Sequence, residues 1–168
     1  PPATGVQEQA REVRYGALDR WARERGLSAV VTAHHLDDQA ETLVMRLARG
    51  AGVRGLAGMR QAATVPGSDV PLLRPLLSWR RLELAQICAD AGIEPVADPT
   101  NSDEQFERVR VRRALADAEW LYPEALAASA GNLAESDAAL RWATDREWSR
   151  AVDATASEIT YRPDSAPS

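Results

Sequence analysis

Apolar and polar positions in the first third of the chain predict a helix, a short strand and a second helix. Residues 6–26 place apolar side chains near helical spacing and end at Gly26, a typical helix terminator. Residues 29–33 form a short, nearly all-apolar run of the kind found in buried parallel strands. A second helix is expected over residues 37–49. Helix, strand and helix in this order are typical of an α/β sheet covered by helices on both faces.

The rest of the chain is richer in turn residues. Residues 49–59 contain four glycines and are expected to form a loop. Residues 70–77 are interrupted by Pro71 and Pro75, which limits them to a broken or edge strand. Three further helices are expected, over residues 79–91, from about residue 104, and from Pro123 onwards.

These patterns divide the chain into three parts. Residues 1–77 are expected to form part of a Rossmann-like parallel sheet with flanking helices. Residues 78–122 continue that α/β unit with helices and an arginine-rich segment, and residues 123–168 are expected to form a long helix and a polar tail. The predicted fold class is therefore α/β, followed by a mainly helical C-terminal region.

Composition narrows the class of protein. A chain of 168 residues with 45% apolar content can bury a core. No apolar stretch approaches the roughly 20 residues that span a bilayer, and the first residues lack the pattern of a signal peptide. The single cysteine, Cys88, permits neither an internal disulfide nor a multi-thiolate metal site, so we expect a reducing compartment, the cytoplasm.

The charged residues are unevenly distributed. All 20 basic residues are arginine, which excludes a G-x-x-x-x-G-K-[ST] phosphate loop and a Schiff-base lysine from this sequence. The net charge is −5, but residues 1–60 carry nine arginines against seven acids, whereas residues 114–168 carry four against ten. An anionic partner is therefore expected to contact the first part of the chain.

Candidate chemistry gathers in residues 32–42, TAHHLDDQAET, directly after the expected strand. Ligands of open α/β sheets bind beyond the carboxyl ends of the strands, which is where His34 and His35 fall. A metal-dependent phosphohydrolase that uses His34, His35 and Asp38 is one alternative. It needs further His or Asp ligands, and these are the only two histidines of the chain.

Three acids follow the histidines. Asp38 and Glu41 are three residues apart and so share one helix face, whereas Asp37 is expected to cap the start of the helix. A pair of carboxylates on one face suits the binding of an ammonium group and the acceptance of its proton. The alternative is ordinary acidic charge in a first turn, which the helix dipole favours by itself.

A second candidate segment is FERVRVRRAL, residues 106–115. It places four cations within six residues: Arg108, Arg110, Arg112 and Arg113. Few acids lie one helical turn before them, so contact with RNA phosphates is a hypothesis and a solvated helix face is the alternative. A non-enzymatic, RNA-binding helical module is accordingly a competing function.

Four segments, in the same order, resemble the tRNA(Ile)-lysidine synthases, a family of ATP pyrophosphatase-type ligases. They are AREVRY (10–15), the run 32–59, RPLLSWRRLEL (74–84) and DPTNSDEQFERVRVRRAL (98–115). The resemblance covers residues 4 to about 140 and implies an adenine nucleotide alpha hydrolase-like fold. Val109 is a departure, since the family usually has Asn there.

The resemblance implies a two-step ligation on tRNA(Ile) with a CAU anticodon. ATP, with Mg²⁺ expected beside it, adenylates the C2 oxygen of the wobble cytidine, and the ε-amine of free lysine then displaces AMP. Motif positions imply the roles of individual residues. Asp38 and Glu41 are expected to bind lysine, and Arg14, His34 and His35 to lie beside the reacting groups. Arg110 and Arg112 are expected to contact tRNA, and Arg113 is added to them because of its charge.

The SGGxDS pyrophosphate-binding loop of that family does not occur in this sequence. In the family this loop lies upstream of the segment that resembles residues 10–15, so it is expected to precede Pro1. We therefore expect the chain by itself to be inactive, or nearly so, in ligation.

Overall fold

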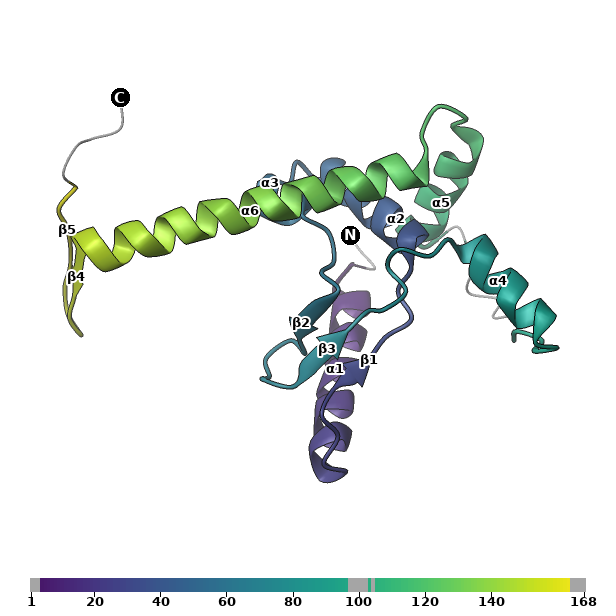
Figure 1. The fold of residues 1–168 in the computed structure, drawn as a ribbon, viewed down its shortest axis with the longest axis horizontal. Helices are drawn as coiled ribbons and strands as arrows, with labels where there is room; N and C mark the ends of the chain where they lie inside the picture. The colour runs from purple at the N-terminus through teal and green to yellow at the C-terminus, as the bar shows by residue number, and fades with distance from the viewer. Residues whose placement is uncertain (1–3, 97–102, 104, 164–168) are drawn as a thin grey trace.

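The computed structural model describes residues 4–96, 103 and 105–163, in which helices predominate over short strands (Figure 1). In chain order the elements are α1 (Thr4–Glu24), β1 (Val30–Val31), α2 (Leu36–Leu47), α3 (Val53–Leu56), β2 (Ala62–Thr64), β3 (Pro71–Leu73), α4 (Arg81–Asp90), α5 (Glu107–Asp117), α6 (Pro123–Ala151), β4 (Val152–Ala154) and β5 (Ile159–Tyr161). The helix expected from about residue 104 begins at Glu107, and residue 104 lies outside the described residues.

The first three strands form one small sheet in the order β1-β3-β2. Val30 of β1 pairs with Leu72 of β3 in parallel, whereas β2 pairs with β3 antiparallel. The predicted parallel sheet is therefore confirmed for β1 and β3 only. Residues 70–77 were expected to form a broken or edge strand. The strand is short, since β3 covers only Pro71–Leu73, but the edge position was wrong, because β3 is central. Pro71 is tolerated since it stands at the first residue of the strand, where a missing N–H costs the ladder little.

The core lies between α1 and one face of this sheet. It is formed by buried side chains from the helix, the strands and the turn before β3, namely Tyr15, Ala22, Val30, Val65, Val70 and Leu72. Successive strand residues point to opposite faces, so Val31 is directed away from this core and is 62% exposed. Helices on both faces were expected, but in the described part of the chain this strand is covered on one face.

The glycine-rich segment after α2 is more ordered than predicted, because it contains helix α3. Gly50 ends α2 with a positive φ of 69°. The side chain of Gln39 on α2 donates to the Met59 carbonyl and accepts from the Met59 N–H, both at 2.7 Å. Gly58, with a φ of 64°, packs so closely that a Cβ there would lie 2.7 Å from Gln39 Oε1. These glycines serve turns and close packing.

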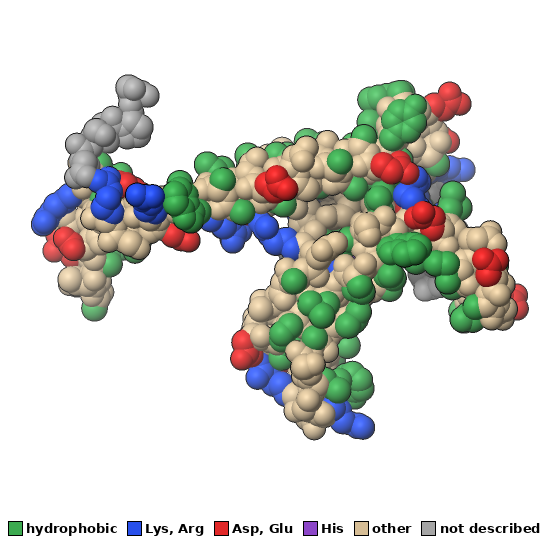
Figure 2. Space-filling model, viewed as in Figure 1, with side chains coloured by type: hydrophobic (Ala, Val, Ile, Leu, Met, Phe, Trp, Pro, Cys, Tyr) green, Lys and Arg blue, Asp and Glu red, His purple; other side chains and the backbone are tan. Residues whose placement is uncertain are grey.

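Helix α6 joins this body to a distal arm. Its first half packs along α2 and α3, where Ala130 is buried and Asp137 accepts from Arg60 at 2.8 Å. Its second half extends beyond the body and ends in the β4–β5 hairpin, which the sequence did not predict (Figure 1). Hydrophobic side chains are exposed along this helix (Figure 2). In the part of the chain that the structure describes, no helix combines the length and apolar character needed to cross a membrane.

Candidate functional site

The start of α2 is fixed by a reciprocal pair of hydrogen bonds. The prediction of Asp37 as N-cap was wrong, because α2 begins at Leu36 and the cap is His35. The Asp38 N–H donates to His35 Nδ1 at 3.4 Å, and the His35 N–H donates to Asp38 Oδ2 at 3.0 Å. This arrangement is a capping box with histidine in place of the usual hydroxyl residue. It holds both side chains in place at the carboxyl side of β1.

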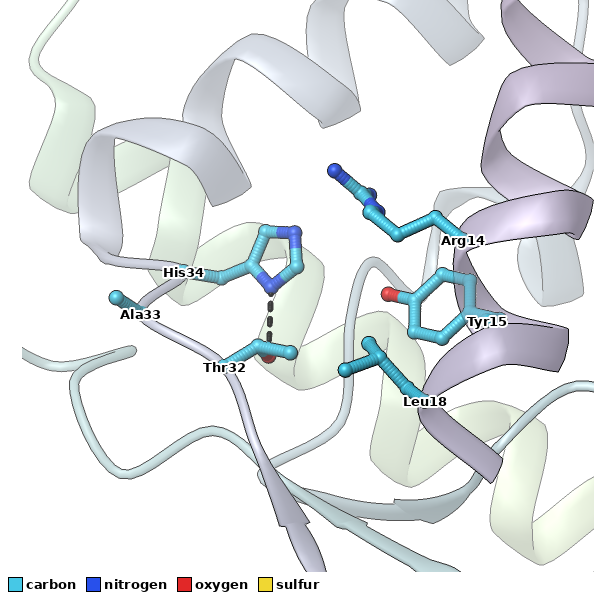
Figure 3. A pocket seen from close by; sticks show the side chains of 6 residues that line it. All are labelled: Arg14, Tyr15, Leu18, Thr32, Ala33 and His34. Carbon is cyan, nitrogen blue, oxygen red and sulfur yellow. Dashed lines mark hydrogen bonds between the residues drawn. The ribbon is translucent and has the colours of Figure 1, made fainter. Parts of the chain in front are cut away.

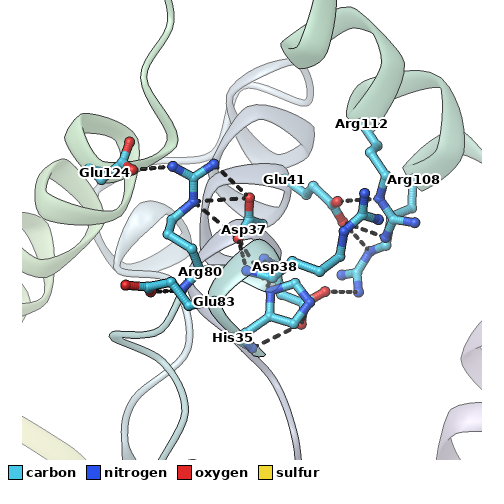
Figure 4. A network of polar contacts seen from close by, with 10 residues as sticks. His35, Asp37, Asp38, Glu41, Arg80, Glu83, Arg108, Arg112 and Glu124 are labelled. Atoms are coloured by element: carbon cyan, nitrogen blue, oxygen red, sulfur yellow. Dashed lines mark hydrogen bonds and ion pairs between the residues drawn. The ribbon is translucent and has the colours of Figure 1, made fainter. Parts of the chain in front are cut away.

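Asp37 instead connects three helices (Figure 4). Its carboxylate accepts from Arg80 Nη2 at 3.1 Å and from the Arg81 N–H at 2.7 Å, and Arg80 also pairs with Glu124 at the start of α6. Burial by itself raises the pKa of Asp37, but the bonds from Arg80 and from the Arg81 backbone outweigh burial and lower that pKa below its usual value. Asp37 is thus a structural residue, as expected, but it binds Arg80 and Arg81 and does not cap α2.

Glu41 is buried against α5. The residue is 2% exposed, and its carboxylate accepts from Arg112 Nε at 2.7 Å and from Arg112 Nη2 at 3.4 Å. Arg108 lies across the two acids, with Nε 3.6 Å from Glu41 Oε2 and Nη1 3.6 Å from Asp38 Oδ1 (Figure 4). The hydrogen bond that Arg112 donates to Glu41 raises the pKa of Arg112 against the opposing effect of burial. Asp38 and Glu41 therefore share a face, as the spacing predicts, and that face meets two arginines.

Two carboxylates and two guanidinium groups balance in charge at this contact between α2 and α5. Any further cation would consequently have to displace a guanidinium to reach Glu41. The pairing of Arg108 with the acids was missed by sequence reasoning, which looked for partners on its own helix. The available signal was spacing, because Arg108 and Arg112 are four residues apart and so lie on one face.

The other predicted tRNA contacts lie elsewhere on α5. Arg110 is exposed and donates to the Gln105 carbonyl at 3.1 Å, and Arg113 is exposed as well. The arginine-rich segment is therefore divided by the helix into an inward side, with Arg108 and Arg112 on the acids of α2, and an outward side.

A pocket of about 340 Å³ lies between α1 and the end of β1 (Figure 3). It is lined by residues of both segments: Arg14, Tyr15, Leu18, Thr32, Ala33 and His34. Two predicted site residues, Arg14 and His34, are thus brought to one pocket from positions twenty residues apart. His35 is not among the lining residues.

The surroundings of His34 favour the neutral imidazole. Burial is the largest effect and lowers its pKa below the ordinary value of 6.5. The charge of Asp38 opposes this, whereas the positive charges of Arg74, Arg108 and Arg11 lower the pKa further. A neutral imidazole has one nitrogen that donates and one that accepts, so which nitrogen faces the pocket decides its chemistry.

Tyr15 was missed by the sequence reasoning. It is 1% exposed, and its hydroxyl has no hydrogen-bond partner within the described ranges. The guanidinium carbons of Arg11 and Arg14 lie 5.2 and 5.5 Å from the centre of its ring. The only sequence signal was its position next to Arg14. A buried hydroxyl without a partner is unusual, and here it belongs to a residue that lines the pocket.

Comparison with known proteins identifies the class first. The chain belongs to the PP-loop domain family, which its residues 2–119 match. It is also similar to several proteins named tRNA(Ile)-lysidine synthase. One from Novosphingobium aromaticivorans is 62% identical over 146 residues, which are 86% of this chain and 45% of that protein.

Two further relatives with that name come from other bacteria. One from Zymomonas mobilis is 41% identical over 145 residues, covering 85% of this chain and 44% of that protein. One from Ralstonia nicotianae is 39% identical over 153 residues, covering 89% of this chain and 32% of that protein. The chain thus spans less than half the length of each relative. The resemblance predicted from four segments is confirmed, and a PP-loop domain implies the adenine nucleotide alpha hydrolase-like α/β fold.

Proposed function

We propose that this chain forms part of a tRNA(Ile)-lysidine synthase, which uses ATP to join lysine to C2 of the wobble cytidine in CAU-anticodon tRNA(Ile). The observation that carries the proposal is the 62% identity to a protein of that name. A match over 86% of the chain necessarily includes residues 32–113, and so both α2 and α5. The carboxylate pair and its arginine partners lie within that match.

Asp38 and Glu41 are proposed to bind the lysine ammonium group. Their placement one turn apart on the same face, beside the pocket residue His34, supports this role. In the reaction the amine must lose a proton before it forms the C2–N bond and AMP leaves with the C2 oxygen, and a nearby carboxylate is a suitable acceptor. Because Arg108 and Arg112 already neutralise both acids, lysine binding requires one guanidinium to move.

The phosphates of tRNA are anions that can compete with Asp38 and Glu41 for Arg108 and Arg112. Arg110 and Arg113 on the outward side of α5 are proposed to contact the tRNA backbone, since clustered arginine favours phosphate binding. A contact between tRNA and Arg112 additionally requires the release of Arg112 from Glu41. Binding of tRNA would then free the acids for lysine, which places tRNA before lysine.

Arg14 and His34 are proposed to lie beside the reacting cytidine, with His35 acting through its cap on α2. The pocket that Arg14 and His34 share, with the unpartnered hydroxyl of Tyr15, supports a polar ligand group there. This part of the proposal concerns the binding and orientation of the base.

ATP is the implied cofactor, and Mg²⁺ is expected on its phosphates. The described residues fit a polar group in the pocket but offer no phosphate cradle: Gly58 is packed against Gln39, and α3 occupies part of the glycine-rich segment. No group of three His, Cys, Asp or Glu side chains within those residues is placed to hold a metal ion. We therefore assign no step on the ATP phosphates to them. The substrates tRNA and ATP favour the cytoplasm as the compartment.

A segment exchange tests the proposal directly. The stretch of the Novosphingobium aromaticivorans relative that matches this chain is replaced by the chain itself, and lysidine formation is measured with ATP, lysine and tRNA(Ile). We expect ligation at a rate close to that of the parent, and loss of at least about a hundredfold in kcat/KM for lysine when Asp38→Asn is added.

Arg20→Gln, an exposed change on α1, is the matched control and is expected to leave ligation unchanged. A folded chimera without ligation would contradict the proposal. Ligation unaffected by Asp38→Asn would remove the lysine role. Binding of RNA without any ligation would favour the RNA-binding module, and stoichiometric metal bound through His34, His35 and Asp38 would favour the phosphohydrolase.

A further inference from the structure

Thr32 is the residue that holds His34 in place. It directly follows β1, and its backbone N–H donates to the Leu73 carbonyl of β3 at 2.9 Å, which fixes its backbone to the sheet. Its hydroxyl oxygen lies 2.9 Å from Nδ1 of His34. One imidazole nitrogen is therefore engaged by a rigid part of the fold, while the other, Nε2, lies on the side of Arg14 (Figure 3).

The direction of this hydrogen bond sets the tautomer of His34. Thr32 Oγ1 can donate or accept, and a neutral imidazole has one protonated nitrogen. Within the described residues His34 Nδ1 is the side-chain partner found for that hydroxyl. When the hydroxyl donates to Nδ1, Nδ1 keeps its lone pair and Nε2 carries the hydrogen; when Nδ1–H donates to the hydroxyl, the hydrogen is absent from Nε2.

When Thr32 donates, the pocket presents hydrogen-bond donors from two segments. Arg14 brings a guanidinium group from α1, and His34 brings an Nε2–H from the end of β1. Tyr15 lines the same cavity, and its buried hydroxyl has no hydrogen-bond partner within the described residues. Donors that converge on one cavity fit an oxygen atom that accepts hydrogen bonds.

We propose that Thr32 is a positioning residue, whose hydroxyl donates to Nδ1 of His34 and so presents Nε2–H, beside Arg14, to an oxygen acceptor of the substrate. The inference rests on the proposed function only for the identity of that oxygen, the C2 oxygen of the wobble cytidine. The tautomer of His34 is a property of this chain alone and can be measured without any substrate.

Nuclear magnetic resonance of ¹⁵N-labelled histidine tests the tautomer. The chain has two histidines, and His35→Asn, which keeps a good N-cap, assigns the signals. We expect the neutral ring of His34 to show a protonated Nε2 and an unprotonated, hydrogen-bonded Nδ1. A neutral ring with its hydrogen on Nδ1 would overturn the proposal.

Two substitutions at Thr32 separate positioning from packing. Thr32→Val keeps the shape and removes the hydroxyl, and Thr32→Ser keeps the hydroxyl. Loss of the hydroxyl should shift the pKa of His34 by about 0.7, and Thr32→Ser should restore it. The charged groups around the ring stay the same in both variants: Arg11 and Arg14 on α1, Asp38 on α2, Arg74 after β3 and Arg108 on α5.

An unchanged pKa of His34 in a folded Thr32→Val variant would overturn the proposal, and the circular dichroism spectrum establishes that the variant is folded. In the segment-exchange enzyme, Thr32→Val should lower kcat/KM about tenfold and Thr32→Ser should restore it. If that enzyme forms no lysidine at all, the proposed function fails while the two magnetic resonance results still decide the role of Thr32.

Discussion

Asp37 and Glu41 stand one turn apart on α2, yet their carboxylates bind arginines from different elements. Asp37 binds Arg80 at the start of α4, whereas Glu41 binds Arg112 of α5. Four residues in a helix correspond to slightly more than one turn, so a small rotation around the axis separates two tertiary contacts. At the residue scale, the identity of each acid was readable from the sequence and its partner was not.

Asp37→Asn tests the structural role of that carboxylate. The pKa of Asp37 is lowered in the folded chain, so its stabilisation is present above the unfolded-state pKa and is lost as pH falls through the lower, folded-state pKa. We expect Asp37→Asn to reduce the free energy of unfolding by about 1 to 2 kcal/mol at pH 7, a figure that allows for partial exposure. The difference from the parent should shrink below about pH 4.

Urea unfolding at a series of pH values measures this difference. Asp90→Asn is the matched control, because Asp90 is exposed and its only described partner is Gln86 on the same helix. We expect that control to change stability by less than about 0.5 kcal/mol at every pH. A pH-independent effect of Asp37→Asn would contradict the role assigned to its charge.

At the scale of elements, α5 packs on α2, and ion pairs connect the two helices. Arg108 and Arg112 are four residues apart on α5 and lie over Asp38 and Glu41 on α2. Such pairing across helices supplies the acidic partners that the arginine-rich segment lacks on its own helix.

A double-mutant cycle between Glu41→Gln and Arg112→Gln tests this docking. Each single change removes the partner that is hydrogen-bonded to the remaining charge and should cost about 2 to 4 kcal/mol, while the coupling between them should be about 1 to 3 kcal/mol. Arg110→Gln on the outward side of the same helix is the control and should show no coupling with Glu41. Additive effects of Glu41→Gln and Arg112→Gln, measured by urea unfolding, would contradict the docking.

At the scale of the whole molecule, the first half of α6 packs on the body, whereas the second half does not. Ala130 and Asp137 are buried where α6 crosses α2 and α3, and Arg60 reaches Asp137 from the segment before β2. Farther along the helix Trp142 and Trp148 are exposed, and the helix extends away from the body (Figure 1). Packing therefore ends before the helix does.

Truncation tests where that boundary lies. A chain that stops after Thr144 keeps Asp137 with both of its partners, Arg60 and Arg141, and we expect its melting temperature to stay within about 2 °C of the parent. A chain that stops after Ala134 loses Asp137 and should melt several degrees lower, at about 2 to 4 °C for each kcal/mol lost. Equal melting temperatures of the two truncated chains, measured by circular dichroism, would contradict this boundary.

The sequence by itself determined the helices around the site and the types of chemical group available there. The helix from Pro123 and the face shared by Asp38 and Glu41 follow from periodicity and spacing, which are local properties of the chain. The four segments that resemble tRNA(Ile)-lysidine synthases pointed to the relatives, because a motif is a run of consecutive residues and can be read without the fold.

Only the tertiary structure decided the partners. The central position of β3, the docking of Arg112 on Glu41 and the meeting of Arg14 with His34 each join residues that are far apart in the chain. Pairing of strands and docking of helices depend on how elements come together, and no local pattern of charge or hydrophobicity encodes that. The sequence therefore supplied the reactive groups, and the fold selected which of them touch.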